Sequence, residues 1–327
     1  MRWTGWFVAS WMACLGAAQA QAQPQVQAWP DRPVRVVVPF PASGATDLVA
    51  RVVAQQVSQE LGRQFVIDNK PGAGGTIGVA EAAKGAPDGY TLLLTTSSTH
   101  AISPHLIKRL AYDPRKDFTP IAHLADAASV LLVTPQLPVK SVPELIAYAK
   151  AHPGELNYAT SGNGTIVHLN TAAFSAQAGI EMTHVPYKGT AQSIADLAAG
   201  NVHVLFDSLP TGMPHVQSGR VRALAVTGAR RSAMAPDLPT LAESGLPGYS
   251  SVTWFGLYAP AGLPPALAAR INKAFTQAMQ SREVADKLGR LGVEPAPASS
   301  AAQFDAMVQA DSERWAAVIR KYKISVE

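Results

Sequence analysis

The sequence predicts an α/β protein of two lobes, each a mostly parallel sheet flanked by helices. Two series of short apolar runs alternate with helical segments, one starting at residue 34 and the other at residue 129, and this alternation is typical of βαβ units. Two amphipathic helices then close the chain and need an existing sheet to cover. A length of 327 residues with an apolar share of 47% is enough for two domains with their own cores.

The first strand is predicted over residues 34–38, where valine fills four of the five positions. Pro39 and Pro41 end this strand, and a tight loop leads to a helix that begins near Thr46. The core face of that helix carries valine every four residues: Val49, Val53 and Val57.

Two further strands complete the first βαβαβ series. They are predicted at residues 65–67 and 90–94, with a helix of small residues through Ala83 between them. Residues 112–114 and 117–120 each end in proline and are expected to be loops. This order of elements implies a parallel sheet with helices on both of its faces.

The second series begins with a strand at residues 129–133. Later strands are expected at 156–160, 182–187, 202–206, 221–226 and 254–258, with helices between most of them. The two closing helices present apolar stripes that start at Leu267 and at Phe304, and we expect both to pack back on the first sheet.

Packing of the closing helices on the first sheet makes the first domain discontinuous. We predict domain 1 over residues 29–125 plus 252–327 and domain 2 over residues 126–251. The chain then crosses between domains twice, near Ala125 and near Ser251, and two lobes joined by two crossings suit a hinge.

The N-terminus has the features of a secretory signal peptide over residues 1–20. A basic residue, Arg2, precedes a short apolar stretch, and Ala18-Gln-Ala20 fits a small-x-small cleavage site. The alternative is a lipoprotein whose first mature residue is Cys14, although Trp-Met-Ala before it matches that signal poorly. Cys14 is the single cysteine, so cleavage after Ala20 leaves no disulfide, thiolate or cysteine-metal site. No later stretch is apolar enough to span a membrane, and we expect the mature protein to be soluble and exported.

Composition and motifs exclude several classes of protein. The net charge is only +4 and no run of Lys or Arg occurs, so nucleic-acid binding is not expected. The glycine-rich segment from Gly72 misses the dinucleotide fingerprint, because Ile77 stands where its third glycine belongs. Common hydrolase, zinc and phosphate-loop motifs are absent, and the scattered histidines do not pair with carboxylates at metal spacing. We therefore expect no cofactor and no metal.

Two strand–loop–helix turns are candidate anion sites. The first holds Pro41-Ala-Ser-Gly-Ala45, and the second holds Ser161-Gly-Asn-Gly-Thr165. The first amides of a helix have no partner inside the helix and carry partial positive charge, so such a turn can bind a carboxylate. The alternative is that these glycines only make tight βα turns, as any α/β protein requires.

Other candidates follow predicted strands. Ser97 and the segment Tyr187-Lys188-Gly189 offer hydroxyl groups, amides and a cation, and Asp207 either meets a ligand or caps the next helix. Asp47 would repel a carboxylate, so we favour a role in shaping its loop unless the ligand also carries an amine or hydroxyl. His168 could serve a periplasmic hydrolase together with Ser97 or Ser161, which is the enzymatic alternative.

The chain resembles the substrate-binding proteins of tripartite tricarboxylate transporters, also called Bug proteins. The matching motifs run in family order over almost all of the mature chain. They include Pro39-Phe-Pro-Ala-Ser-Gly-Ala-Thr-Asp47, Asn69-Lys-Pro-Gly-Ala-Gly-Gly-Thr-Ile-Gly78 and Pro87-Asp-Gly-Tyr-Thr-Leu-Leu93, with further matches at 112–114, 184–189, 222–227, 239–245 and 254–262.

The resemblance implies a periplasmic binding protein of the Venus flytrap type that captures a small organic acid, a mono- or dicarboxylate, between its lobes, without catalysis. It implies delivery to the subunits of a membrane permease; a sensor subunit for the same ligands is the alternative. We expect a monomer. The family usually has Gly-Gly where this chain has Ser43-Gly44, which puts the ligand's identity in question. The expected ligand-binding residues are Phe40, Pro41, Ser43, Gly44, Ala45, Asp47, Ser97, Thr160, Ser161, Gly162, Thr165, His168, Tyr187, Lys188, Gly189 and Asp207.

Overall fold

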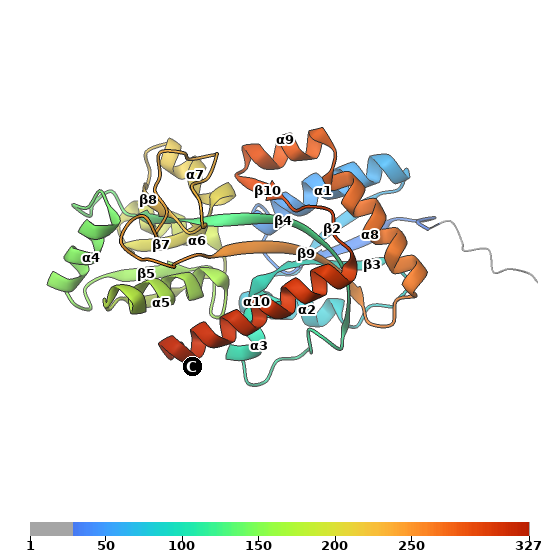
Figure 1. Ribbon diagram of the computed structural model, residues 1–327, viewed down its shortest axis with the longest axis horizontal. Coiled ribbons are helices and arrows are strands. Elements are labelled where there is room, and N and C mark those ends of the chain that lie inside the picture. Colours follow the sequence, from blue (N-terminus) through green and yellow to red (C-terminus); the bar gives the residue numbers. More distant parts are fainter. Residues whose placement is uncertain (1–28, 327) are drawn as a thin grey trace, which may run out of the picture.

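The structure, a computed structural model, describes residues 29–326 as two α/β lobes (Figure 1). The predicted signal peptide and Cys14 lie outside the described residues. The first part of the chain forms β1 (Val34–Val38), α1 (Ala45–Leu61), β2 (Phe65–Asn69), η1 (Ala73–Gly75), α2 (Thr76–Ala82), β3 (Thr91–Thr96), η2 (Ser98–Ile102), α3 (Ser103–Leu106) and β4 (Phe118–Val133).

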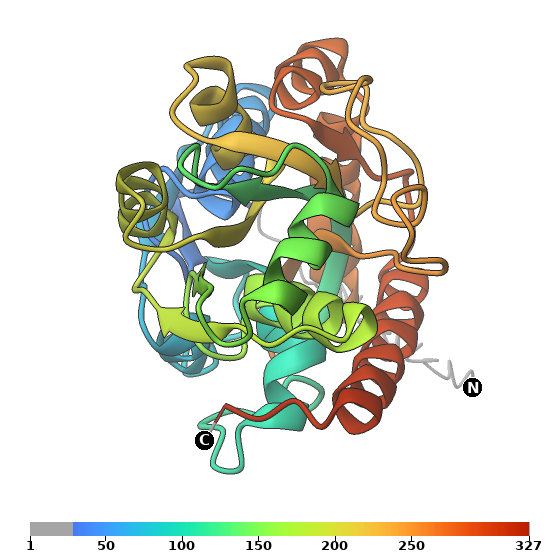
Figure 2. The ribbon, with the colours of Figure 1, turned by 90° about the vertical axis from the view of Figure 1, so that its left-hand side faces the viewer.

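The second part of the chain completes both lobes. It forms α4 (Val142–Ala151), β5 (Asn157–Thr160), α5 (Ile166–Ala178), β6 (Thr183–Pro186), α6 (Thr190–Ala199), β7 (Val204–Ser208), α7 (Leu209–Gln217), β8 (Arg222–Val226), β9 (Val252–Pro260), α8 (Pro265–Met279), α9 (Arg282–Arg290), β10 (Val293–Pro295) and α10 (Ala301–Tyr322). Figure 2 looks onto the second lobe, with α4 and α5 toward the viewer.

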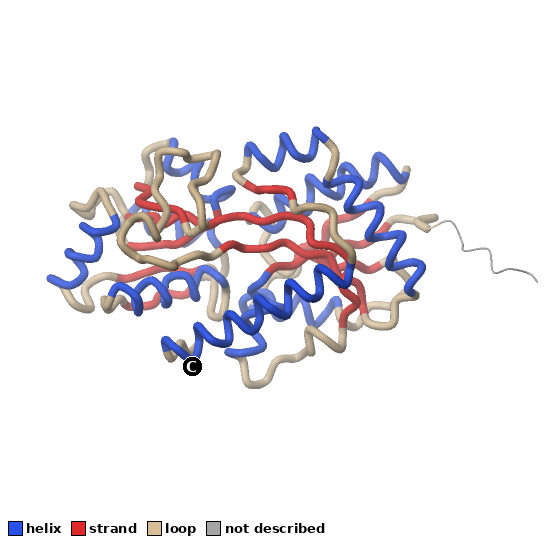
Figure 3. The backbone as a smooth tube through the Cα atoms, in the orientation of Figure 1, coloured by secondary structure: helices blue, strands red, loops and turns tan. Residues whose placement is uncertain are grey.

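Strand β4 joins the two lobes. As far as Ala128 it pairs with β9 and β10, and from Ser129 it pairs with β7 and β8. Figure 3 shows β4 and β9 running together along the length of the molecule. The prediction of a loop at 117–120 was wrong for Phe118 to Pro120, which begin β4. A register irregularity after Pro120 accommodates the proline within the strand.

The strand pairing is parallel away from β4 and β9. In the first lobe β2, β1 and β3 are parallel neighbours, and in the second lobe β6, β5 and β7 are parallel neighbours. Every antiparallel pair between the described strands involves β4 or β9. The predicted α/β class and two-lobed fold are confirmed, but the sheets are mixed rather than mostly parallel, because the strands that link the lobes run against the rest.

The closing helices divide their contacts. Helix α8 packs on α1 and β4, whereas α10 packs on β4 and η2 and also touches α5 of the second lobe. Helix α9 was not predicted, because it buries only Val284 and Leu288 and its remaining residues are mostly charged or small. The division into 29–125 plus 252–327 and 126–251 stays a prediction; the strand pairing changes between Ala128 and Ser129.

The core consists of two clusters of buried hydrophobic residues, one within the first lobe and one that spans both lobes. One lies between the first sheet and helices α1, α8 and α9, and includes Val53, Phe275 and Leu288. The other continues from the opposite face of that sheet into the second lobe, and includes Phe206 and Trp315. Among the described helices, none has the length and apolar character required to cross a membrane.

Candidate functional site

The β1–α1 turn is shaped by Asp47. The side chain of Asp47 is buried, and its carboxylate accepts hydrogen bonds from the Ser43 amide (2.9 Å), Arg51 Nε (2.8 Å) and Asn69 Nδ2 (3.0 Å). Burial raises the pKa of Asp47, but these hydrogen bonds outweigh it and hold the pKa below its ordinary value. Asp47 is therefore an ionised group whose oxygens are committed to the loop.

Helix α1 begins without a side-chain cap. Its N-cap residue is Gly44, which has no side chain to accept from the first amides, so the amides of Ala45 and Thr46 lack an intrahelical partner. Ser43, one residue earlier, is exposed and has a φ of 64°, in the left-handed region that favours glycine. The start of this 17-residue helix is half-buried at Gly44 and Ala45, and its uncapped amides suit an anion.

Helix α5 begins with its amides already bonded. Thr165 is the N-cap, and its hydroxyl accepts from the His168 amide at 3.4 Å and donates to the Gly162 carbonyl at 2.8 Å. The Ile166 amide donates to Ser98 Oγ of the first lobe at 3.1 Å. The amides of Ile166 and His168 therefore already have protein partners, and the partner of Ile166 lies in the first lobe.

Glycines let the two lobes meet closely at what we call the interlobe junction, formed by residues 39–45, 72–75 and 97–99 of the first lobe and 160–166 and 187–190 of the second. A Cβ added to Gly74 would lie 2.6 Å from the Asn163 carbonyl oxygen. A Cβ added to Gly162 would lie 3.6 Å from the Gly74 Cα. A side chain at Gly74 would therefore hold the lobes apart, whereas one at Gly162 would make only an ordinary contact with Gly74.

Two ring side chains line the first-lobe part of the interlobe junction. The ring of Phe40 lies against Gly75, where an added Cβ would come within 3.0 Å of it. Pro41 lies against Gly189 of the second lobe, where an added Cβ would come within 2.9 Å of the Pro41 Cγ. Gly189 is also the N-cap of α6, and like Gly44 it provides no side-chain cap.

The polar candidates at the junction differ in how far they are committed. Ser97 is buried and its hydroxyl has no hydrogen-bond partner among the described residues. Thr160 Oγ1 bonds His184 Nε2 at 2.7 Å, and Ser161 Oγ donates to Thr165 Oγ1 at 3.5 Å. Ser97 is thus the hydroxyl group with the most unused hydrogen-bonding capacity.

In the Tyr187–Gly189 segment, the hydroxyl and the amide of Tyr187 already have hydrogen-bond partners in the protein. The Tyr187 hydroxyl donates to Asp196 at 2.6 Å, and burial together with that carboxylate raises the pKa of Tyr187 to about 12. The Tyr187 amide donates to the Thr160 carbonyl. Lys188 is exposed to solvent.

His168 lies beneath the second turn. Its ring stacks on His184 at 4.3 Å, and its Nδ1 accepts from the Gly164 amide at 3.3 Å. Burial, and secondarily the nearby His184, lower the pKa of His168 to about 4, so it is neutral at pH 7. Among the described residues, no hydrogen bond joins His168 to Ser97 or Ser161 as a hydrolase would require, and no group of His, Cys, Asp or Glu could hold a metal ion.

Asp207 lies near the end of β7, two residues before α7 begins. It is buried and accepts from Thr211 Oγ1 at 2.7 Å. Burial raises the pKa of Asp207 to about 7, and hydrogen bonds from Thr211, the Ser208 backbone and Thr190 only partly offset this. The ligand contact predicted for Asp207 stays a prediction. The alternative, that Asp207 caps the next helix, was wrong, because the N-cap of α7 is Ser208 without a side-chain cap and Asp207 instead accepts from a side chain one turn along.

Sequence reasoning missed two parts of the interlobe junction. Gly74 and Gly75 were considered only for a dinucleotide fingerprint, and the structure brings them against Asn163 and Phe40. Ser98, which bonds Ile166, was not among the expected ligand-binding residues. The glycine-rich run was the available signal, but a single chain does not say which loop of the other lobe it meets.

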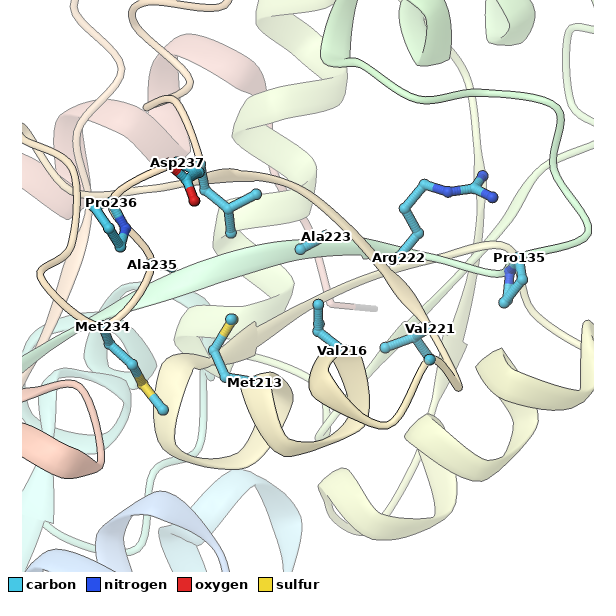
Figure 4. A pocket seen from close by; sticks show the side chains of 12 residues that line it. Pro135, Met213, Val216, Val221, Arg222, Ala223, Met234, Ala235, Pro236 and Asp237 are labelled. Atoms are coloured by element: carbon cyan, nitrogen blue, oxygen red, sulfur yellow. The ribbon is translucent and has the colours of Figure 1, made fainter.

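A separate pocket of about 540 Å³ lies in the second lobe, lined by residues of α7, β8 and the loop 234–238. Figure 4 shows Met213 and Met234 at one side of it and the Arg222 guanidinium directed away from them. Arg222 donates to the carbonyls of Leu137 and Val139. Because its one arginine is already used by the backbone, this pocket is a poorer anion site than the interlobe junction.

Known proteins share both sequence and fold with this chain. Residues 49–324 match the family described as "Tripartite tricarboxylate transporter family receptor". The structure is similar to that of Rpa4515 from R. palustris with adipate, at 40% identity and a TM-score of 0.88, covering 91% of this chain and 99% of that one.

Two further solved structures agree. The periplasmic binding protein BugD is 33% identical with a TM-score of 0.86, covering 91% of this chain and 99% of BugD. MatC from Rhodopseudomonas palustris with bound malate is 35% identical with a TM-score of 0.84, covering 89% of this chain and all of that one. The predicted resemblance to Bug-type receptors is confirmed.

Proposed function

We propose that this chain, which belongs to the tripartite tricarboxylate transporter receptor family, binds a small dicarboxylate at the interlobe junction and catalyses no reaction on it. The observation that carries the proposal is the uncapped start of α1 at Gly44, facing a second lobe that glycines allow to come close. Backbone amides at a helix start bind an anion without a charged side chain.

The α1 turn supplies the first carboxylate site. The amides of Ala45 and Thr46 and the helix dipole favour negative charge there. The Asp47 carboxylate would oppose it, but Arg51 neutralises Asp47 at 2.8 Å and the remaining lone pairs accept from Ser43 and Asn69. The loop is therefore fixed in shape and close to neutral overall.

A second uncapped helix start suits the second carboxylate. Helix α6 begins after Gly189, which lies against Pro41 of the first lobe. The buried hydroxyl of Ser97 offers one more hydrogen bond. Adipate and malate, the ligands of two related structures, each carry two carboxylates, and this supports a dicarboxylate as the ligand class.

Membership of this family supports a location and a kind of partner. We propose that the chain is exported by the signal peptide at 1–20, acts in the periplasm as a monomer, and delivers its ligand to membrane permease subunits. Ligand binding would stabilise the closed arrangement of the lobes, and the closed form is what a membrane partner would recognise.

Calorimetric titration of the mature protein tests the proposal. Adipate and malate are compared with hexane-1,6-diol, which matches adipate in length but has no charge. We expect saturable binding of at least one diacid, no binding of the diol, and no chemical change in the recovered acid. A diacid at 100 times its Kd should add about 2.7 kcal/mol to the free energy of unfolding. Binding of the diol or of neutral sugars without any acid would contradict the proposal.

A further inference from the structure

A buried carboxyl group lies beside each of the two uncapped helix starts, and the two carboxyl groups differ in their partners. At α1, Arg51 Nε lies 2.8 Å from the carboxylate of Asp47 and neutralises it. At α6, Asp207 is equally buried, but it accepts from the Thr211 hydroxyl at 2.7 Å and from other neutral groups. The charge of Asp207 is therefore not balanced by a cation among these partners.

The strand topology places Asp207 at the edge of the sheet where α6 begins. Strands β6, β5 and β7 are parallel, so their carboxyl ends lie along one edge. The chain leaves β6 and reaches Gly189, the N-cap of α6, and Asp207 is the last residue but one of β7. Thr190, the first residue of α6, bonds Asp207 through its side chain. Asp207 thus lies one hydrogen bond away from the helix start that we propose for the second carboxylate.

A ligand carboxylate at this helix start would act on Asp207 as a like charge. Hydrogen bonds favour the ionised form of Asp207 and burial opposes it more strongly, so its pKa is about 7. Near pH 7 the free protein therefore holds both forms of this group in similar amounts. A second negative charge nearby disfavours ionisation further, so the bound ligand shifts Asp207 toward its protonated form.

Other titratable groups near β7 do not offset this effect. The part of β4 that pairs with β7, residues 129–133, carries none. Those on the packed elements β4, β5, α5, α6 and α7 are His123, Asp126, Tyr158, His168, Asp196 and His215, and Lys188 precedes α6. None of these charges is among the causes that set the pKa of Asp207.

We propose that Asp207 binds a proton together with the ligand: when a carboxylate of the diacid reaches the start of α6, the Asp207 carboxylate takes up a proton from the solvent. The inference rests on the proposed function, since it requires a ligand carboxylate at this helix start. The hydroxyls of Thr211 and Thr190 can accept as well as donate, so the protonated group keeps its hydrogen bonds. The protein therefore binds the diacid more tightly in mild acid than in mild base.

Calorimetric titration of the mature protein with adipate and malate, in buffers of equal pH and different ionisation enthalpy, counts the protons taken up on binding. At pH 7 about half of Asp207 is ionised in the free protein, so we expect uptake of about 0.4–0.5 proton per diacid. Affinity should fall about tenfold between pH 6.5 and pH 8.5. The carboxyl groups of the ligands have pKa values of about 4–5 and stay ionised over this range.

Asp207→Asn gives the side chain the shape and neutrality of the protonated acid. We expect this variant to take up no proton, to bind equally at both pH values, and to bind about tenfold more tightly than the wild type at pH 8.5. Glu243→Gln is the matched control in the same lobe, because Glu243 is exposed, paired with Arg231, and has a pKa below its ordinary value. It should keep the proton uptake and the pH dependence of the wild type.

The ¹³Cγ resonance of Asp207 in labelled wild-type protein reports the same proton without any substitution. Its titration midpoint should rise by about one pH unit or more when the diacid saturates the site. Diacid binding without proton uptake, an unmoved Asp207 midpoint, or wild-type proton uptake in Asp207→Asn would overturn this inference and leave the proposed function intact. Failure of every diacid to bind at any pH would overturn the proposed function and the inference together.

Discussion

The β1–α1 turn and the β5–α5 turn have the same parts in the same order, yet they use their helix amides differently. Helix α5 has a threonine cap and gives its Ile166 amide to Ser98 of the other lobe. Helix α1 follows a glycine and has no side-chain cap, while Asp47 holds the loop from behind. The first turn therefore suits the proposed anion site, whereas the amides of the second turn are bonded to protein groups of both lobes.

The two glycine-rich turns are similar in sequence but differ in the role that we propose for each. An anion site needs free amides, a fixed loop and no net negative charge, which the Asp47–Arg51 pair provides. A contact between lobes needs small residues and bonded amides, which Gly162 and Thr165 provide. Four substitutions test this difference between the two turns.

The largest effect is expected for Gly74→Ala. The new Cβ would meet the Asn163 carbonyl oxygen at 2.6 Å, and relieving such a contact costs about 1–3 kcal/mol. Affinity for adipate or malate should fall about tenfold to a hundredfold by calorimetry, because closure of the lobes is opposed.

Gly62→Ala is the control for Gly74→Ala. Gly62 has nearly the same φ, 65° against 66°, but nothing lies within 4 Å of an added Cβ. Both variants should lose about 1–2 kcal/mol of stability from the left-handed backbone, while only Gly74→Ala loses affinity. Equal affinities in the two variants would show that the contact of Gly74 with Asn163 does not affect ligand binding.

Asp47→Ala should come next in size. It leaves the Ser43 backbone amide and the Asn69 side-chain amide without this acceptor in a partly buried loop, so the free energy of unfolding should fall by about 1–3 kcal/mol. Because the pKa of Asp47 is below its ordinary 3.8, its stabilisation is present above that pH and is lost as the pH falls through the lower, folded-state value.

Denaturation of Asp47→Ala and wild type at pH 7 and pH 3 checks this sign. The stability difference should be large at pH 7 and smaller at the lower pH. A difference that grew on acidification would show that Asp47 does not stabilise its loop as a carboxylate.

Thr165→Ala should have a smaller effect, confined to the second turn. Loss of an N-cap costs about 1 kcal/mol, and the hydroxyl here also donates to Gly162. Urea denaturation should show this loss with only a slight change in affinity for the diacid. An affinity loss as large as that of Gly74→Ala would mean that the second turn also binds the ligand directly.

Ser43→Gly is expected to change stability least. It relieves a φ of 64° but adds freedom to the unfolded chain, so the two contributions, each about 1 kcal/mol or less, largely cancel. The measurable change should be in ligand preference, since Ser43 is exposed beside the uncapped α1 amides. Identical calorimetric profiles for a series of diacids in the two proteins would exclude a role in selectivity.

The local elements were predictable because their signals are local. The valine run of β1 and the start of α1 near Thr46 follow from neighbouring residues. The long strand β4 was not predicted, because a proline such as Pro120 usually marks the end of a strand. Only the irregular pairing with β9 accommodates it. The β9 partners of β4 lie more than a hundred positions away, as in the pair Phe118 and Pro260.

The site could be predicted in part for the same reason. The first turn and the role of Asp47 in shaping it follow from spacing within one loop. The contacts of Gly74 with Asn163 and of Ser98 with Ile166 join lobes that are distant in sequence. The Tyr258 hydroxyl has no hydrogen-bond partner among the described residues. This too is a consequence of packing, and no sequence motif signals it.

A titration of ¹⁵N-labelled mature protein with adipate tests the central claim most directly. If the start of α1 binds a carboxylate, the amide resonances of Ala45 and Thr46 should move downfield in proportion to saturation, because their N–H groups gain a charged acceptor. The Ile166 amide, already bonded to Ser98, should move less. Saturable binding that leaves Ala45 and Thr46 unmoved, with shifts gathered elsewhere, would contradict the account.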